Sequence, residues 1–353
     1  MPINQEHDFF IQWHLTERCN LRCTHCYQTG RKTDEMSLPE IRDVADEFLK
    51  MMKAWEESYD ISLSPSFNIT GGEPFLRKDI FEVLEEISGR GIDNYVLTNG
   101  TLIDRRKAEK LSKLRVKGVQ VSMEGPEEVH DTIRGKGSFR TSLKGIANLL
   151  DAGLTVTMNA TLSEINAKYF EDMFALAYSI GVQRIGFSRL VPSGRGMGLL
   201  DKMIAKEKLK DIYETIFSLK AGAVEIVTGD PVASQMSTPS EDADSGSTPA
   251  GGCAAGISGL TILPDGTITP CRRLFIPIGN VRKDRLREVW ATSEVLEALR
   301  KRSRYKGKCG ECSRWSMCRG CRAIAYAYSR SRGENDFLAD DPQCFIHTGK
   351  NFA

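Results

Sequence analysis

Residues 17–28 read ERCNLRCTHCYQ and place three cysteines, Cys19, Cys23 and Cys26, in a C-x3-C-x2-C pattern. Structural metal sites usually have four protein ligands, whereas catalytic sites leave one position open. Three thiolates on one short loop can hold three corners of a four-iron cluster and leave one iron free for a small chelating ligand. The loop therefore predicts an incomplete metal site, with a zinc site or an incidental thiol cluster as the alternative.

The chain around this loop predicts a parallel α/β sheet. From about residue 9 to residue 230, short apolar runs alternate with helical periodicity, as in βα units. The predicted strands are the six runs 9–15, 66–72, 94–100, 118–124, 155–161 and 184–190. Between them lie helical patterns, several of them ending on glycine, over 38–55, 79–91, 139–153 and 167–181. Six repeats predict a partial (β/α)6 TIM-like barrel.

Each of the first four predicted strands leads into residues that can bind a ligand. The cysteine loop follows the first strand, GGEP (71–74) the second and TNGT (98–101) the third, and SMEG (122–125) ends the fourth. In barrels of parallel strands, ligands bind at the carboxyl ends of the strands. We therefore expect all four motifs to surround one mouth.

The C-x3-C-x2-C pattern, followed by Tyr27 and placed after the first strand of a βα barrel, resembles the radical S-adenosylmethionine (SAM) superfamily. The resemblance implies a 4Fe–4S cluster whose fourth iron is chelated by the amino and carboxylate groups of SAM. It also implies reductive cleavage of SAM to methionine and a 5′-deoxyadenosyl radical, which abstracts a hydrogen atom from the substrate while the protein positions the reactants.

The same resemblance assigns the residues expected to bind SAM. GGEP matches the motif for the SAM amino group, in which glycine backbone approaches the ligand and Glu73 accepts a hydrogen bond from the ammonium. Asn99, Ser122 and Arg134 resemble positions near the ribose and the carboxylate, with turn or surface roles as the alternative. The expected SAM-binding residues are Tyr27, Gly71, Gly72, Glu73, Asn99, Ser122 and Arg134. His14, His25 and Glu124 receive no role, and no acid or base is assigned.

The other seven cysteines lie near the C-terminus, after a gap of more than two hundred residues. Their order, which includes C-x2-C-x5-C-x2-C from Cys309 to Cys321, resembles the SPASM extension with its two auxiliary clusters. The last C-x2-C pair, Cys318 and Cys321, is one residue shorter than the usual spacing in that extension. The resemblance assigns one auxiliary 4Fe–4S cluster to Cys309, Cys312, Cys318 and Cys344, and leaves the other with Cys253, Cys271 and Cys321. Taken alone, the C-x2-C pairs fit a zinc site equally well.

Composition limits the class of partner. The 48 Lys and Arg residues nearly balance the 47 Asp and Glu residues, so no overall charge draws the protein to nucleic acid or an anionic membrane. No signal peptide and no membrane-spanning apolar run are evident, which predicts a soluble cytoplasmic protein.

The basic stretch 300–322 holds nine Lys or Arg residues and one Glu. We expect it to compensate cluster charge or dock a reductant such as a ferredoxin or flavodoxin, rather than bind nucleic acid.

Residues 237–252 are small, polar and rich in Gly and Pro, which is typical of a linker. The expected organisation is a radical SAM barrel over 1–236, a linker over 237–252 and a SPASM-like domain over 253–353. Within the last region, 259–274 (GLTILPDGTITPCRRL) predicts two short strands around a Pro-Asp-Gly turn.

The sequence leaves the substrate open between two classes. The leading hypothesis is the modification of a ribosomally made peptide, such as formation of a thioether or carbon–carbon crosslink, as in many SPASM-bearing relatives. Only 18 residues precede Cys19, so a leader-peptide-binding domain would be a separate protein. The alternative is the modification of tetrapyrrole propionates, because residues 190–196 (LVPSGRG) and 318–345 resemble enzymes of that kind. A non-catalytic zinc scaffold is a third possibility.

Overall fold

The computed structural model describes residues 6–30, 32–219, 224–236 and 248–346. Ten strands form one sheet in the order β10-β9-β8-β1-β2-β3-β4-β5-β6-β7. The six predicted strands are its parallel centre, in chain order: β1 (Glu6–His14), β2 (Ser62–Thr70), β3 (Asp93–Thr98), β4 (Gly118–Ser122), β5 (Val156–Leu162) and β6 (Arg184–Arg189). The chain thus has the expected α/β fold with a partial TIM-like barrel.

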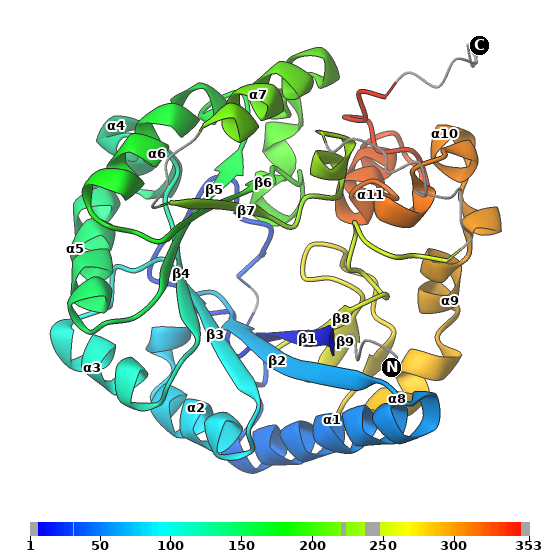
Figure 1. Ribbon diagram of the computed structural model, residues 1–353, viewed down its shortest axis with the longest axis horizontal. Coiled ribbons are helices and arrows are strands. Elements are labelled where there is room, and N and C mark those ends of the chain that lie inside the picture. The colour runs from blue at the N-terminus through cyan, green and yellow to red at the C-terminus, as the bar shows by residue number, and fades with distance from the viewer. Residues whose placement is uncertain (1–5, 31, 220–223, 237–247, 347–353) are drawn as a thin grey trace, which may run out of the picture.

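Helices cover the outer face of the curved sheet (Figure 1). All four predicted helical segments are present, and the last of them begins with a 3-10 turn (Ala167–Tyr169). The helices that follow the barrel strands are α1 (Leu38–Tyr59), α2 (Ile80–Gly89), α3 (Arg105–Lys113), α4 (Glu127–Arg134), α5 (Ser138–Asp151), α6 (Phe170–Ser179) and α7 (Lys206–Ser218). Ser37 and Glu40 form a capping box at the start of α1, which fixes where this helix begins. None of the helices in the described ranges is long and apolar enough to cross a membrane.

The core lies between these helices and the sheet. Trp13 of β1 and Phe67 of β2 are fully buried and contact each other edge to face, and Phe48 of α1 packs on Phe67. Successive residues of a strand point to opposite faces, so the neighbours of Trp13 point inward. Gln12 and His14 are accordingly buried on the inner side, where the functional groups gather.

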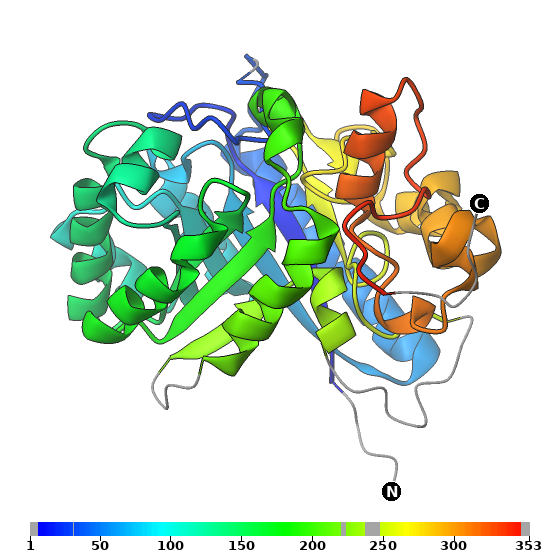
Figure 2. The same ribbon diagram turned by 90° about the horizontal axis from the view of Figure 1, so that it is seen from above.

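The C-terminal region extends the same sheet. The predicted hairpin is present as β8 (Gly259–Ile262) and β9 (Thr267–Thr269), which pair antiparallel around the expected turn. The sequence did not predict that β8 also pairs parallel with β1, or that β7 (Glu225–Thr228) and β10 (Gly279–Asn280) close the two edges. Figures 1 and 2 show the C-terminal helices beside this hairpin on one side of the barrel: α8 (Leu286–Thr292), α9 (Glu294–Arg300), α10 (Gly307–Glu311) and α11 (Arg322–Ser331).

The proposed domain boundaries stay a prediction. Most of the expected linker, residues 237–247, lies outside the described residues. Its end is attached to the C-terminal region, since the backbone N–H groups of Ala250 and Gly251 donate to the carbonyl of Ser316 at 2.9 and 3.1 Å.

Candidate functional site

Three thiols meet at the mouth of the barrel. Cys19, Cys23 and Cys26 line a cavity of about 140 Å³, here called the barrel chamber. Its wall includes six of the seven expected SAM-binding residues: Tyr27, Gly71, Gly72, Asn99, Ser122 and Arg134. The carboxyl ends of the first four strands thus converge as the sequence predicts, although individual SAM contacts stay predictions.

The glycines of GGEP hold the cysteine loop in place. The N–H of Gly72 donates to the carbonyl of Thr16 at 2.7 Å, and the N–H of Glu73 donates to that of Arg18 at 2.8 Å. A Cβ on Gly72 would lie 2.2 Å from the Arg18 carbonyl oxygen, so only glycine allows this approach. From the sequence, we expected these glycines to approach the ligand closely. The structure shows close approach to the backbone that leads into the cysteines.

Glu73 lies beneath the chamber rather than in its wall. Its carboxylate is fully buried and accepts hydrogen bonds from the Thr98 hydroxyl at 2.8 and 2.9 Å, and from the backbone N–H groups of Asn99 and Phe75 at 2.9 and 3.2 Å. Burial raises the pKa of Glu73 to about 7, against these hydrogen bonds. The side chain joins the turn after β2 to the turn after β3, and its direct contact with SAM stays a prediction.

Asn99 lies beside the first cysteine. Its side-chain N–H₂ group donates to Asn20 Oδ1 at 2.9 Å and lies 3.9 Å from Cys19 Sγ. The backbone N–H of Leu21 also points at Cys19 Sγ, at 3.4 Å. Burial raises the pKa of the Cys19 thiol to about 11, and a bound metal would favour the thiolate that ligation requires. Amide donors around a thiol suit an iron–sulfur cluster, whose sulfurs accept such bonds.

A buried charge cluster lies on the other side of the cysteine loop. Arg134 donates to Glu124 Oε1 from Nε at 2.9 Å and from Nη2 at 2.5 Å, and its Nη1 lies 3.8 Å from Cys23 Sγ. His25 Nε2 lies 3.3 Å from the same carboxylate oxygen. Burial opposes ionisation of Glu124, but Arg134 and His25 hold its pKa well below the usual range.

This cluster supplies two roles that the sequence analysis missed. Glu124 orients Arg134 toward Cys23. His25, to which we assigned no role, pairs with Glu124 and lines the chamber. Arg134 and Glu124 are ten positions apart, at the end of α4 and just after β4. This pair could have been predicted, because opposite charges just after a strand and at the end of the following helix often lie close together in a βα unit.

The segment 190–196 packs against the back of the cysteine loop. The N–H of Gly196 donates to the Cys26 carbonyl at 3.0 Å. A Cβ on Gly194 would lie 2.1 Å from the Tyr27 carbonyl oxygen, which explains the glycine there. The motif that resembled tetrapyrrole enzymes is therefore part of the support for the cysteine loop.

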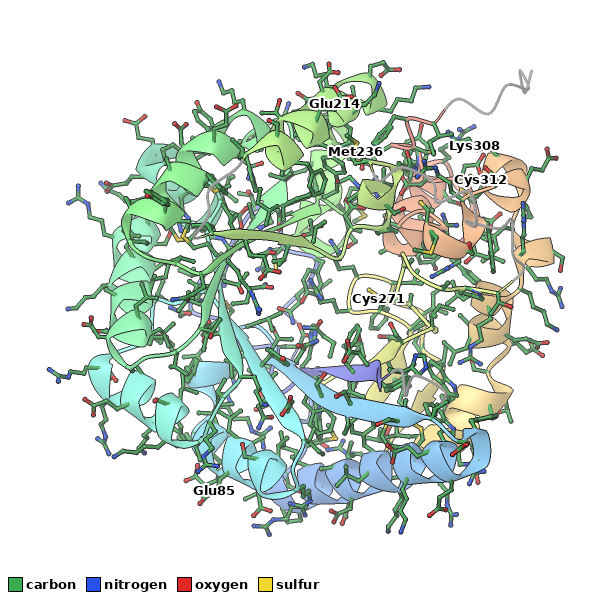
Figure 3. All side chains as sticks on the ribbon, in the orientation of Figure 1. Glu85, Glu214, Met236, Cys271, Lys308 and Cys312 are labelled. Atoms are coloured by element: carbon green, nitrogen blue, oxygen red, sulfur yellow. The ribbon has the colours of Figure 1, made fainter. Side chains whose placement is uncertain are left out.

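The seven late cysteines form two groups. Cys309, Cys312, Cys318 and Cys344 line one small cavity of about 20 Å³, as the resemblance implied. Of the other three, Cys253 lies within electrostatic range of Cys321, and Cys271 packs in the same apolar cluster as Cys321. Figure 3 shows Cys271 toward the centre of the molecule, whereas Cys312 lies in the outer C-terminal segment.

Amide donors lie close to two of these thiols. Gln235 Nε2 lies 3.7 and 3.4 Å from Cys318 Sγ and Cys344 Sγ, and the N–H of Gly320 lies 3.3 Å from Cys318 Sγ. Such donors suit the sulfurs of an iron–sulfur cluster, which accept hydrogen bonds of this kind.

The basic stretch 300–322 is built into the cluster loops. Buried Arg322 places Nη2 3.9 Å from Cys309 Sγ, and buried Arg319 donates to the Cys253 carbonyl at 2.8 Å. Arg302 donates to the carbonyl of Cys312 at 3.0 Å. These contacts favour charge compensation over a nucleic-acid patch.

A second and larger cavity adjoins the barrel chamber. This outer cavity has a volume of about 410 Å³ and shares Tyr27, Gln28, Arg272 and Arg273 with the chamber. Its remaining wall is largely apolar and includes Pro192, Met197, Leu200, Leu263, Pro264, Phe275, Tyr326 and Ala327.

The dividing wall between the two cavities is anchored on His14. The Tyr27 hydroxyl lies 3.4 Å from His14 Nε2, and Gln28 Nε2 lies 3.2 Å from His14 Nδ1. Burial, followed by the charge of Arg272, lowers the pKa of His14 to about 3 and keeps the imidazole neutral. His14 had no role assigned from the sequence because its partners, Tyr27 and Gln28, come from outside its strand.

Comparisons with known proteins agree with this geometry. The radical SAM superfamily model matches residues 13–177, and the SPASM model, an iron–sulfur cluster-binding domain, matches residues 253–322. AdoMet-dependent heme synthase of Methanosarcina barkeri is 30% identical over 360 residues, which cover 96% of this chain and 97% of that protein. Mycofactocin maturase MftC of Mycolicibacterium smegmatis is 30% identical over 327 residues, which cover 90% of this chain and 78% of the maturase.

Solved structures share the fold at lower identity. SuiB of Streptococcus suis bound to S-adenosylmethionine superposes with a TM-score of 0.73 at 18% identity, covering 96% of this chain and 78% of SuiB. Native anSMEcpe with bound AdoMet and a peptide gives 0.70 at 20% identity, covering 96% and 94%. The chain belongs to the radical SAM superfamily, as an enzyme that uses S-adenosylmethionine and 4Fe–4S clusters and carries a C-terminal SPASM domain.

Proposed function

We propose that this enzyme modifies the propionate side chains of a tetrapyrrole. The observation that carries the proposal is the outer cavity, which is large, mainly apolar and shares four wall residues, Tyr27, Gln28, Arg272 and Arg273, with the barrel chamber. A flat macrocycle needs a cavity of this kind to hold its apolar body. It also needs polar groups at defined points to bind its side chains. When bound at the three-cysteine site, SAM supplies the radical that abstracts a hydrogen atom.

The similarity to named enzymes supports the same substrate class. The heme synthase of Methanosarcina barkeri matches over nearly its full length, and the Fe-coproporphyrin III synthase of the same organism is 27% identical over 366 residues. This order reverses the one drawn from the sequence, in which a peptide came first. The tail and the 190–196 segment that suggested the alternative both lie at the site, since Tyr326 lines the outer cavity and Gly194 contacts Tyr27.

Peptide modification is the second candidate, and the form of the cavity mouth favours it. Met197 and Phe275, exposed at 67% and 53%, lie in the lining of the outer cavity, where an extended chain could enter with the rest outside. The similarity to MftC points the same way. A separate leader-peptide-binding protein belongs to this candidate. A ferredoxin or flavodoxin as electron donor, and a cytoplasmic location, stay predictions for both.

The test is substrate-dependent cleavage of SAM. Anaerobically reconstituted enzyme is mixed with SAM, a reductant and iron coproporphyrin III, which carries four propionates, and 5′-deoxyadenosine and the porphyrin mass are followed by liquid chromatography and mass spectrometry. We expect the porphyrin to shift its Soret band on binding, to raise 5′-deoxyadenosine formation and to change in mass. Absence of binding and of any mass change would contradict the proposal. Product formed instead on a co-encoded small peptide would establish the second candidate.

A further inference from the structure

Two adjacent arginines form the boundary between the barrel chamber and the outer cavity. Arg272 and Arg273 line both cavities and lie in the short loop between β9 and Leu274, where a bridge between Cys271 and Leu274 fixes the backbone. Each side chain is half-buried. The two guanidinium groups lie within electrostatic range of each other. Like charges in a partly dry site repel each other, so a bound anion near both would be favoured.

Neutral groups hold this arginine pair. Arg272 Nη1 donates to Gln12 Oε1 at 2.6 Å, and Arg273 Nη1 donates to the Arg189 carbonyl at 3.2 Å. Arg273 Nε is buried and has no hydrogen-bond partner among the described residues. A buried donor without a partner is unusual in folded proteins, so a missing partner is expected there.

The nearby carboxylates do not neutralise the pair. Among the described residues, neither arginine forms an ion pair with a carboxylate, although Glu17 and Asp265 line the same outer cavity. Asp230 lies within electrostatic range of Arg273, but its carboxylate is bound by Arg189 at 2.6 and 2.9 Å. Other ionisable groups within electrostatic range of Arg273 are Tyr27, Cys271 and Cys321, which carry negative charge only when deprotonated.

We propose that the Arg272–Arg273 pair binds a carboxylate of the substrate and directs the carbon chain that bears it into the barrel chamber. The planar fork of an arginine matches the two oxygens of a carboxylate, and a lysine would lack that geometry. The inference rests on the proposed function, which makes the carboxylate a tetrapyrrole propionate. The macrocycle then occupies the apolar part of the outer cavity, with one edge at the pair and the reacting carbons facing the chamber.

The experiment compares an acid and its ester on reconstituted enzyme. Dissociation constants of iron coproporphyrin III and of its tetramethyl ester are measured by Soret titration for wild type, Arg272→Gln, Arg273→Gln and Arg273→Lys. Arg287→Gln, an exposed position on α8, is the matched control for loss of one positive charge. The SAM dissociation constant and the reduction potentials of the auxiliary clusters are recorded for every variant.

The proposal predicts that wild type binds the acid at least ten times more tightly than the ester. Arg273→Gln should raise the dissociation constant of the acid about ten- to a hundredfold and leave that of the ester unchanged. Loss of one hydrogen bond to a charged group changes a dissociation constant by about this factor. Arg273→Lys should recover only part of the loss, and Arg287→Gln should match wild type.

Three results would overturn the proposal. If wild type binds acid and ester equally and the variants do the same, the pair has no carboxylate role while the tetrapyrrole function stands. If the variants instead shift the auxiliary potentials or the SAM affinity and leave acid binding intact, the pair serves the neighbouring cluster or SAM. If wild type binds neither porphyrin, the proposed function fails, and the carboxylate role that rests on it fails too.

Discussion

The two cysteine-rich regions are assembled in different ways. The barrel site takes its three thiols from residues 19–26, and the backbone of Thr16 and Arg18 on the approach to that loop is held by the turn after β2. The C-terminal sites collect their thiols from residue 253 to residue 344 and depend on side chains distant in sequence. The ligands of the barrel site lie on one short loop, whereas the dispersed ligands are brought together only by the fold of the whole C-terminal region.

Contacts with the barrel hold the dispersed ligands in place. Arg189 at the end of β6 is fully buried and forms ion pairs with Asp230 at 2.6 Å and with Asp341 at 2.8 Å. Asp341 also accepts a hydrogen bond from the N–H of Cys321 at 2.8 Å and lies in the lining of the four-cysteine cavity. One carboxylate thus connects the barrel with both auxiliary sites.

The largest expected effect separates the two regions by function. Replacing Cys19, Cys23 and Cys26 together with alanine should abolish 5′-deoxyadenosine formation, because no other described group of thiols opens on the barrel chamber. The auxiliary clusters should remain, since their ligands lie elsewhere. Residual cleavage of SAM by this variant would show that the chamber is not the site.

The next effect tests the ion pair between Arg189 of the barrel and Asp341 of the C-terminal region. Asp341→Ala leaves Arg189 with one of its two buried carboxylate partners, and breaking a buried pair lowers the free energy of unfolding by about 3–5 kcal/mol. We expect a lower urea midpoint and loss of auxiliary iron before loss of barrel iron. Asp341→Asn, which keeps an acceptor for the Cys321 N–H, should lose less, and Asp211→Ala on the exposed face of α7 should change neither quantity. Equal loss from both regions would mean that they do not assemble separately.

A smaller effect concerns the barrel alone. Glu73→Ala removes hydrogen bonds to the Thr98 hydroxyl and the Asn99 N–H, so the turn that lines the chamber loses its support. The predicted hydrogen bond from the SAM ammonium to this carboxylate would contribute about 1.5–3 kcal/mol, so we expect SAM affinity to fall about ten- to a hundredfold. Calorimetric titration would measure it, with Glu82→Ala on the exposed face of α2 as control. An unchanged dissociation constant in a folded variant would remove Glu73 from the site.

The smallest effect concerns the tail alone. Gln235 donates toward Cys318 Sγ and Cys344 Sγ, and donors to cluster sulfurs raise the reduction potential. Gln235→Leu should therefore lower the potential of that auxiliary cluster by about 40 mV, as expected for a hydrogen bond of about 1 kcal/mol in a one-electron couple. Electron paramagnetic resonance during a redox titration would measure this. If the reduction potential of the barrel cluster shifted instead, Gln235 would not be a donor to the auxiliary cluster.

The contrast also explains what the sequence could predict. The cysteine loop, GGEP and the six strands carry local patterns, and each was found at its expected place. The pairing of β8 with β1, and the partners of His14 and His25, join residues far apart in the chain. Neither periodicity nor spacing encodes such contacts. Arg272 and Arg273 escaped notice because their position between two cavities exists only in the folded chain.

We expect the chain to hold one SAM-binding cluster in the barrel and separate auxiliary clusters in the C-terminal region. Iron and zinc analysis, with Mössbauer spectroscopy, of the anaerobically reconstituted triple variant Cys19→Ala, Cys23→Ala, Cys26→Ala tests this division directly. We predict about twelve irons per chain for wild type and about eight for the variant, as expected for three and two four-iron clusters. A variant that carries zinc and no iron would contradict the account, because the tail would then be a structural zinc module.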